Sequence, residues 1–133
     1  MVRHYNPELI PAVYNVFEDM PEQKVRKGVY MRMFRALNLT MSWVRIEPDM
    51  ETRPHSHPWE QVVYVVDGTA DFHIDGERIS VEEGDVFFIP PNVEHYEEPN
   101  SDEPCLLMDI WQMREGFLDQ TEYQREFDVD ESI

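Results

Sequence analysis

Short hydrophobic runs separated by turn residues fill the chain from about residue 29 to residue 112. Gly68 and Gly84 mark turns between runs, and Pro90 ends a run sharply because proline cannot donate a hydrogen bond to a sheet. Short strands at this spacing are typical of an all-β sandwich or barrel. The predicted strands are 30–35, 39–47, 60–68, 70–75, 77–81, 85–90 and 105–112.

The segment 70–75, with sequence ADFHID, shows the clearest alternation of apolar and polar residues. This period of two predicts a strand with one buried face and one wet face. His73 falls on the wet face and is interpreted as a structural or solvated histidine. The pair Asp75–Gly76 follows and favours a tight hairpin, because both turn positions require a positive φ.

The two ends of the chain lack this strand pattern. Three prolines within residues 1–28 exclude a long helix and predict an irregular arm with room for one helical turn. Residues 114–133 are acidic and weakly periodic, and a short helix near 115–126 is the expected structure there. The sequence therefore predicts one β domain, residues 29–113, between an N-terminal arm and a C-terminal tail.

Composition limits the partners of this protein. The 133 residues suffice for one domain, and 28 acidic against 11 basic residues give a formal net charge of −17. Such a charge repels phosphate backbones and anionic lipids, so we expect neither a nucleic-acid nor a membrane partner. Adaptation to high salt is a second interpretation of the same charge. No segment approaches the roughly 20 apolar residues that span a bilayer.

The single cysteine, Cys105, excludes an intramolecular disulfide and a zinc-ribbon cluster. Its place in the apolar run CLLMDIW predicts a buried, inert thiol. One unpaired cysteine, together with no apolar stretch of signal-peptide length near the N-terminus, fits a reducing cytoplasm. We therefore expect a cytoplasmic protein.

The candidate chemistry lies in two short histidine-containing segments. His55 and His57 are two residues apart, so an extended chain points both side chains to the same face. Of the next two polar residues, Gln61 shares the parity of His55, whereas Glu60 points the other way. Parity therefore favours Gln61 as a ligand, although a bulge at Pro58 would exchange the two.

His95 belongs to the second segment and would come from a neighbouring strand. Three imidazoles and one amide oxygen would hold a single divalent ion, with Fe, Mn, Ni, Co or Zn suited to such ligands and Ca²⁺ unsuited. Because glutamine replaces a carboxylate, these ligands add no charge, and the metal keeps its Lewis acidity toward a substrate oxygen. Two positions of an octahedral arrangement would remain open.

Both segments resemble the two motifs of the cupin superfamily, and the resemblance covers about residues 40–112. It implies a jelly-roll β-barrel, commonly dimeric, and we expect a homodimer with Val63, Val65 and residues 30–46 as candidates for its interface. The first motif is met by His55, His57, Gln61 and Gly68. The second is met by Gly84, Pro90 and His95, with Asn92 in place of an internal glycine, a substitution that still tolerates a positive φ.

The residues after 105 also resemble the small pectin-degradation cupins, which assist conversion of 4,5-unsaturated uronates to the linear keto form. In that group the last strand carries Asp-x-aromatic followed by an Arg-Glu-Asp-Phe-Leu stretch. Here Asp109 and Trp111 match, whereas Arg114 stands one residue closer and Gly116 replaces the acidic residue. The resemblance implies proton transfer by Asp109, stacking of Trp111 on the sugar and a catalytic role for Arg114.

Further side chains are candidates for contact with a small-molecule substrate. Arg45 or Arg32 would line the cavity and clamp a carboxylate, and Tyr96 would offer a hydroxyl. The alternatives are a solvent-facing arginine, a structural hydrogen bond for Asp109 and core packing for Trp111.

A cupin metal site alone does not define a reaction. The best interpretation is Lewis-acid-assisted ring opening or tautomerisation of an unsaturated uronate, which involves proton transfer and no redox change. The first alternative is an Fe(II)-dependent dioxygenase with an apolar pocket. The second is a non-catalytic cupin that binds a small molecule.

Overall fold

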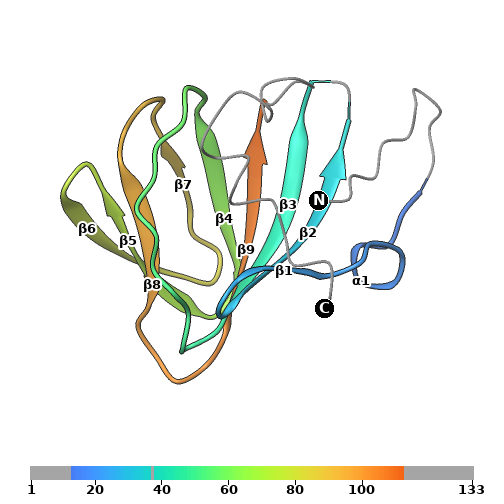
Figure 1. The fold of residues 1–133 in the computed structure, drawn as a ribbon, viewed down its shortest axis with the longest axis horizontal. Helices are drawn as coiled ribbons and strands as arrows, with labels where there is room; N and C mark the ends of the chain where they lie inside the picture. Colours follow the sequence, from blue (N-terminus) through green and yellow to red (C-terminus); the bar gives the residue numbers. More distant parts are fainter. Residues whose placement is uncertain (1–12, 37, 113–133) are drawn as a thin grey trace.

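The computed structural model describes residues 13–36 and 38–112. Two antiparallel sheets form the walls of an all-β structure, with the three-stranded sheet at the left of the view and the six-stranded sheet at its centre and right (Figure 1). The larger sheet contains, in spatial order, β1 (Gln23–Arg26), β2 (Val29–Arg35), β3 (Thr40–Ile46), β9 (Cys105–Trp111), β4 (Gln61–Asp67) and β7 (Val86–Ile89). The smaller sheet contains β6 (Glu77–Glu82), β5 (Thr69–Ile74) and β8 (His95–Pro99).

All seven predicted strands are present, and their ends differ from the predicted ones by no more than one residue. Two further strands, β1 and β8, were not predicted. The sequence of β8, HYEEP, is acidic and ends in proline, and β1, QKVR, has no buried position, so neither shows a strand pattern. Each forms because a neighbouring strand pairs with it, β2 with β1 and β5 with β8. The described part of the predicted arm, residues 13–28, therefore contains a helical turn and a strand.

The turn predictions are confirmed by the backbone angles. Asp75 and Gly76 join β5 to β6 with φ of 52° and 81°. Asn92 has φ of 63°, so it adopts the left-handed conformation for which a glycine is usual. The predicted helical turn is α1 (Val16–Asp19), whose N-cap residue Asn15 accepts hydrogen bonds from the next turn through its side chain. The helix predicted near residues 115–126 falls outside the described residues.

The core lies between the two sheets. In β3 and β9 buried and half-buried residues alternate along the whole strand, so one face of the large sheet is turned inward. Val63 and Val65 on β4 are fully buried, which corrects their assignment to an outer, dimer-forming face. The exposed side chains on β4 and the neighbouring strand β7 are those of Tyr64, Val86 and Phe88. A homodimer remains a prediction.

The alternation in β5 needs one correction, because Asp71 on the expected wet face is only 1% exposed. Its carboxylate accepts hydrogen bonds from Arg78, Ser80 and Asn100, and these donors replace the water that burial removes. Cys105 is a buried free thiol as predicted, and burial raises its pKa to about 12. Among the described residues no helix has the length and apolarity needed to cross a membrane.

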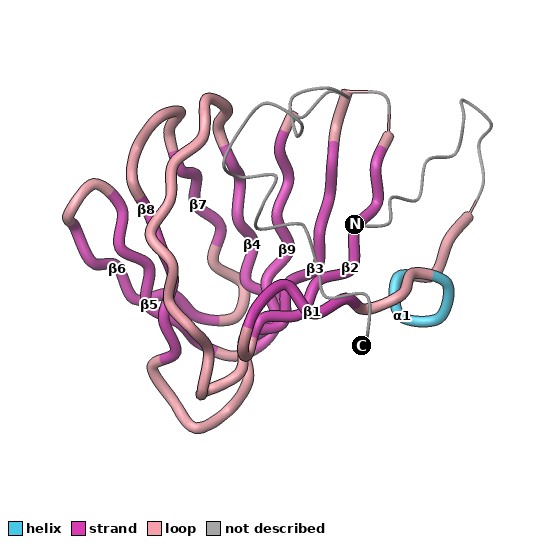
Figure 2. Tube along the Cα trace, viewed as in Figure 1, coloured by secondary structure: helices cyan, strands magenta, loops and turns pink. Residues whose placement is uncertain are grey.

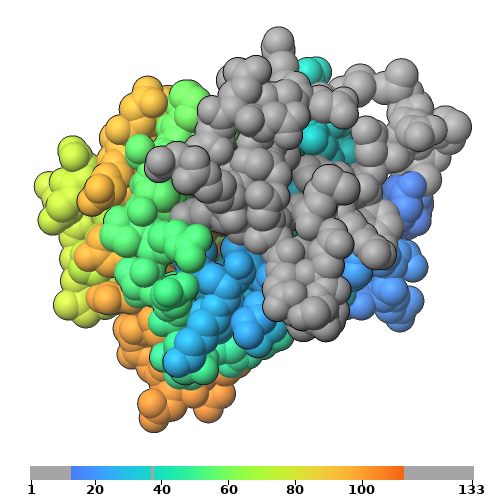
Figure 3. Space-filling view, viewed as in Figure 1, coloured from blue at the N-terminus to red at the C-terminus, as the bar shows by residue number. Residues whose placement is uncertain are grey.

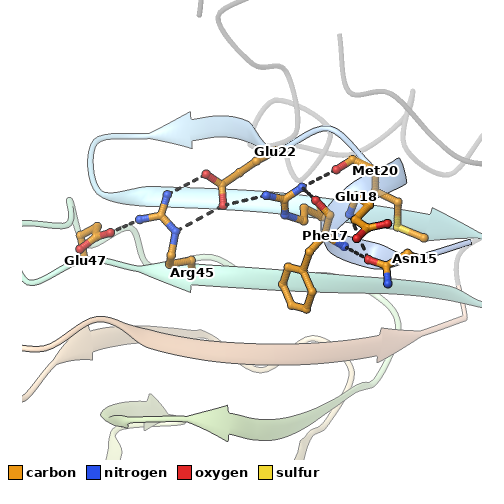
Figure 4. A network of polar contacts seen from close by, with 8 residues as sticks. Asn15, Phe17, Glu18, Met20, Glu22, Arg45 and Glu47 are labelled. Atoms are coloured by element: carbon orange, nitrogen blue, oxygen red, sulfur yellow. Dashed lines mark hydrogen bonds and ion pairs between the residues drawn. The ribbon is translucent and has the colours of Figure 1, made fainter.

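An ion-pair clasp on the outside of the large sheet fixes the segment before β1. Arg45 on β3 pairs with Glu22 at 2.7 Å and also with Glu47 (Figure 4). Arg32 on β2 donates to the backbone carbonyls of Phe17 and Met20. The chain then enters β1, the edge strand of the large sheet that lies next to β2 (Figure 2).

The turn between β1 and β2 depends on Gly28. Its φ is +73°, and a Cβ atom there would lie 2.4 Å from the Cα of Met50. We predict that Gly28→Ala lowers the free energy of unfolding by about 3 kcal/mol, because strain and a backbone clash add. The matched control is Gly76→Ala, with φ of +81° and open space around it. It should cost only about 1 kcal/mol. Urea denaturation measures both, and equal losses would contradict the clash.

Candidate metal centre

Backbone hydrogen bonds join the two histidine-containing segments. His55 and His95 form a reciprocal bridge, in which each amide nitrogen donates to the other's carbonyl at 3.0 and 2.9 Å. The Asn92 amide donates to the His57 carbonyl at 2.7 Å, which ties the left-handed turn of one segment to the other. The side chains of the two segments therefore start from backbones that are fixed relative to one another.

Each of the three histidine rings is oriented by a backbone carbonyl two residues away. The Nδ1 atoms of His55, His57 and His95 lie 3.1, 2.7 and 2.8 Å from the carbonyl oxygens of Arg53, Trp59 and Val93. A carbonyl oxygen only accepts, so Nδ1 carries the proton in every case. The lone pair of each neutral ring is then on Nε2, the usual arrangement for a metal-binding histidine.

The three histidines offer ligand atoms that all lie within 4.8 Å of one another. Nitrogen ligands about 2.1 Å from one ion are separated by about 3 to 4 Å, so small side-chain movements would close the site. His95 Nε2 is buried and has no hydrogen-bond partner among the described residues. These observations fit a bound cation.

Gln61 at the start of β4 lies with the histidines, and its Oε1 is 3.1 Å from His57 Nε2. Since Nδ1 of His57 is the protonated nitrogen, both of these atoms present lone pairs to the same space. Two facing acceptors are favourable when a cation lies between them. Glu60 is exposed, so the structure brings Gln61 and not Glu60 to the site, even though the chain bends at residues 58–59.

The electrostatic environment keeps the imidazoles neutral. Burial, followed by the neighbouring His95, lowers the pKa of His55 to about 3 and that of His57 to about 4. Burial also lowers the pKa of His95. All three rings are therefore uncharged at neutral pH.

Asp109 on β9 is the buried carboxyl group of the site. The Gln61 side chain hydrogen-bonds it, so the Gln61 amide nitrogen is turned to Asp109 while its oxygen is turned to His57. Burial, followed by the charge of Glu97, raises the pKa of Asp109 to about 8. Its Oδ1 is buried with no hydrogen-bond partner in the described part of the chain.

A cavity of about 40 Å³ lies between the sheets beside these groups. This is room for an ion and a few atoms of a ligand, or for a few water molecules. The polar residues of its wall are Arg26, His55, Gln61, His95, Glu97 and Asp109, and the remaining wall is apolar and includes Met31, Phe72 and Leu107.

The comparison with protein families agrees with this geometry. Residues 42–111 match the family described as Cupin domain. The chain belongs to the cupin family. A curated relative, 3-hydroxyanthranilate 3,4-dioxygenase from Burkholderia cenocepacia, is 38% identical over 81 residues, 57% of this chain and 45% of that enzyme. The chain thus spans less than half the length of this relative.

Solved structures show the same fold. An RmlC-like cupin from Shewanella frigidimarina is 26% identical, with a TM-score of 0.70 over 80% of this chain and 96% of that chain. The structure of KdgF from Halomonas sp. is 22% identical, with a TM-score of 0.67 over 80% of this chain and 97% of that chain. The two-sheet architecture of this protein is accordingly a cupin jelly roll.

Two of the predicted substrate-contacting residues lie outside this cupin's cavity. Arg45 is on the outer face of β3, because inward positions of that strand alternate with it, and it belongs to the clasp with Glu22. Tyr96 lies on the outer face of the small sheet, where it stacks on His73 at 4.3 Å, and His73 pairs with Glu98. Neither Arg45 nor Tyr96 lines the cavity beside the histidines, and their contact with a substrate stays a prediction.

The predicted roles of Trp111 and Arg114 in the site also need comparison with the structure. Trp111 is 1% exposed at the end of β9 and borders an outer depression shared with Trp59, not the cavity beside the histidines. Arg114 lies outside the described residues.

Sequence reasoning missed three residues of the site. Glu97 lies two residues beyond His95 on β8, so it is on the same face of the strand as His95. This position could have been predicted if β8 had been recognised as a strand. Trp59 stacks on the His57 ring, with centroids 4.8 Å apart, and also accepts from it through its carbonyl. Arg26 carries no signal of its own, because the strand that places it shows no alternation.

We predict that His95→Ala removes the bound metal, lowering affinity at least about 100-fold, since one of three converging imidazoles is lost. The matched control is His73→Ala, whose side chain pairs with Glu98 on the outer face. Elemental analysis and calorimetric titration with Zn²⁺ measure the change. A full equivalent of metal in His95→Ala would contradict the site.

The depressed pKa values predict an unusual pH dependence of metal binding. Protons compete for Nε2 only as the pH falls to the folded-state pKa values, which are about 3 for His55 and about 4 for His57. Because the pKa of His95 is lowered too, Zn²⁺ affinity should be retained as the pH falls through the ordinary histidine value and should decrease only at lower pH. A decline that begins near pH 6.5, the ordinary histidine value, would contradict buried neutral ligands.

Proposed function

We propose that this cupin is a metal-dependent enzyme that transfers protons on a small oxygenated substrate without redox change. The observation that carries the proposal is the position of Asp109, a buried carboxyl group that lines the same cavity as His55, His95 and Gln61, beside the cluster of three histidines. A divalent ion held by His55, His57, His95 and Gln61 would supply Lewis acidity toward a substrate hydroxyl or carbonyl oxygen.

The residues of the chain supply the rest of the chemistry. The uncharged donor set leaves the charge of the ion uncompensated, so a substrate oxygen near it is polarised strongly. Asp109 lies next to Gln61, and its Oδ1 atom has no hydrogen-bond partner among the described residues. From this position Asp109 can take a proton from a substrate or give one to it. Its hydrogen bond to Gln61 also positions the amide oxygen. Met31, Phe72 and Leu107 belong to the apolar part of the wall around this group.

The finer proposal is ring opening or tautomerisation of a 4,5-unsaturated uronate. Ring opening moves a proton from the anomeric hydroxyl to the ring oxygen as the bond between that oxygen and the anomeric carbon breaks. Tautomerisation then moves a proton from the enol oxygen to carbon, and neither step needs an electron acceptor. Asp109, the acidic residue of the Asp-x-aromatic pattern on β9, supports this substrate, whereas Trp111 of the same pattern lies outside the cavity. The likeness to KdgF from Halomonas sp. supports the shared fold only.

A dioxygenase is the second candidate, and the curated relatives favour it. The 3-hydroxyanthranilate 3,4-dioxygenase from Burkholderia cenocepacia is 38% identical over 57% of this chain. The apolar wall formed by Met31, Phe72 and Leu107 would suit an aromatic substrate.

Anaerobic turnover separates the two candidates. The protein loaded with Ni²⁺, Mn²⁺ or Fe²⁺ should accelerate loss of the ultraviolet absorbance of an unsaturated uronate in the absence of oxygen. A dioxygenase would instead consume oxygen with 3-hydroxyanthranilate, and only with Fe²⁺. Thermal stabilisation by either compound without turnover would indicate a binding protein. Either of these last two outcomes would contradict the proposed proton transfer.

We predict that Asp109→Asn lowers kcat for the uronate at least about 100-fold and leaves one metal ion per chain, because asparagine still accepts from Gln61 but carries no acidic proton. The control is Asp71→Asn, a buried aspartate held by Arg78 and Ser80 away from the cavity. Steady-state kinetics and metal analysis measure both variants. An unchanged kcat in Asp109→Asn would remove Asp109 from the reaction.

A further inference from the structure

The cavity contains one cationic side chain, that of Arg26, among the residues that line it. Arg26 is the last residue of β1, beyond an irregularity in the pairing of β1 with β2 between Lys24 and Arg26. Its side chain is only 6% exposed. In the space-filling view the blue atoms of β1 lie beside the green segment that leads to the histidines, in agreement with the hydrogen bond from Arg26 Nε to the Glu51 carbonyl at 2.8 Å (Figure 3).

The guanidinium group has more donors than the protein uses. Besides the bond from Nε, Nη2 donates to Glu97 Oε1 at 3.3 Å. A guanidinium has five N–H donors, and the described residues provide no acceptor for either hydrogen of Nη1. Because Arg26 lines the cavity, these remaining N–H groups are available to an acceptor from a ligand or from water.

The charges of the cavity favour an anionic ligand. Arg26 and Glu97 neutralise each other as a pair, a histidine that binds a metal ion is neutral, and Asp109 adds at most one negative charge to the wall. A bound divalent ion would therefore leave the cavity positive inside a chain of formal net charge −17. An anion in the cavity would be attracted electrostatically by both the metal ion and the guanidinium, whereas a neutral analogue would lack this attraction between opposite charges.

We infer that Arg26 is the residue that recognises an anionic end of the substrate, and that the substrate class of this site is small carboxylates. The inference rests on the proposed function, because it takes the cavity beside the metal ligands as the substrate site. Glu97 holds the guanidinium in place from β8, and the Glu51 carbonyl holds it from the other side. The paired Nη donors then face the carboxylate, which a guanidinium binds with two parallel hydrogen bonds.

The test uses acetate and acetamide, which have nearly the same shape and differ in charge. Each is titrated into the Co²⁺-loaded protein, and binding is followed by the visible spectrum of the metal and by calorimetry. Wild type should bind acetate at least about tenfold more tightly than acetamide. No measurable preference for acetate in wild type would overturn the inference.

The decisive variant is the double change Arg26→Gln with Glu97→Gln, because it leaves the net charge of the pair at zero and removes only the guanidinium donors. Its acetate affinity should fall at least about tenfold, with acetamide affinity unchanged. Arg26→Lys keeps the charge without the planar donors, and its acetate affinity should also fall. The control is Arg78→Gln, an exposed arginine paired with Asp71, and it should match wild type.

Unchanged acetate affinity in the double variant would overturn the role of Arg26. If that variant does not fold, unchanged acetate affinity in Arg26→Lys would do so. These outcomes are distinct from failure of the proposed function, because the variants retain all metal ligands. A protein that selects acetate through Arg26 but does not open a uronate would keep the inference and lose the uronate.

Discussion

The site depends on three hydrogen bonds from imidazole Nδ1 to backbone carbonyls. In each of His55, His57 and His95 the carbonyl two residues away fixes both the ring orientation and the protonated nitrogen. The reciprocal bridge between the backbones of His55 and His95 then brings two of these rings from different segments to the same place. The histidines are preorganised in this way by the fold itself, before any ion contributes its binding energy.

Burial gives this arrangement its chemical character. Desolvation keeps the imidazoles neutral and disfavours the charge on Asp109, so the cavity contains few charges of its own. Gln61 adds an oxygen ligand without a charge, and its amide links Asp109 to the site. The ion pair between Arg26 and Glu97 is neutral as a unit. A cation placed here would act on a substrate with little compensation from the protein, in contrast to the acidic surface of the molecule.

Much of the fold and of the metal site could be predicted from the sequence, because both follow local patterns. Turn residues set the strand ends, and strand parity selected Gln61 over Glu60. Asn92 adopts the positive φ expected where a glycine was absent. These features are fixed by residues close together in the chain.

The rest of the site depends on tertiary pairing. Arg45 was a candidate for the cavity because it is a cationic residue on a predicted strand. The inward positions of β3 include Ser42 and Val44, however, and Arg45 pairs with Glu22 on the outer face. The cationic side chain that does line the cavity, Arg26, comes from a strand that exists only because β2 pairs with it and Gly28 allows the turn. Glu97 was missed for the same reason on β8.

The account is tested most directly by long-range proton–nitrogen correlation spectra of the histidine side chains in the Zn²⁺-loaded protein. These spectra distinguish a protonated Nδ1 from a metal-bound Nε2 in each ring. We predict that His55, His57 and His95 all retain the proton on Nδ1 and shift at Nε2 when Zn²⁺ binds, while His73 does not shift. Coordination through Nδ1, or a shift in fewer than these three rings, would contradict the arrangement on which the site depends.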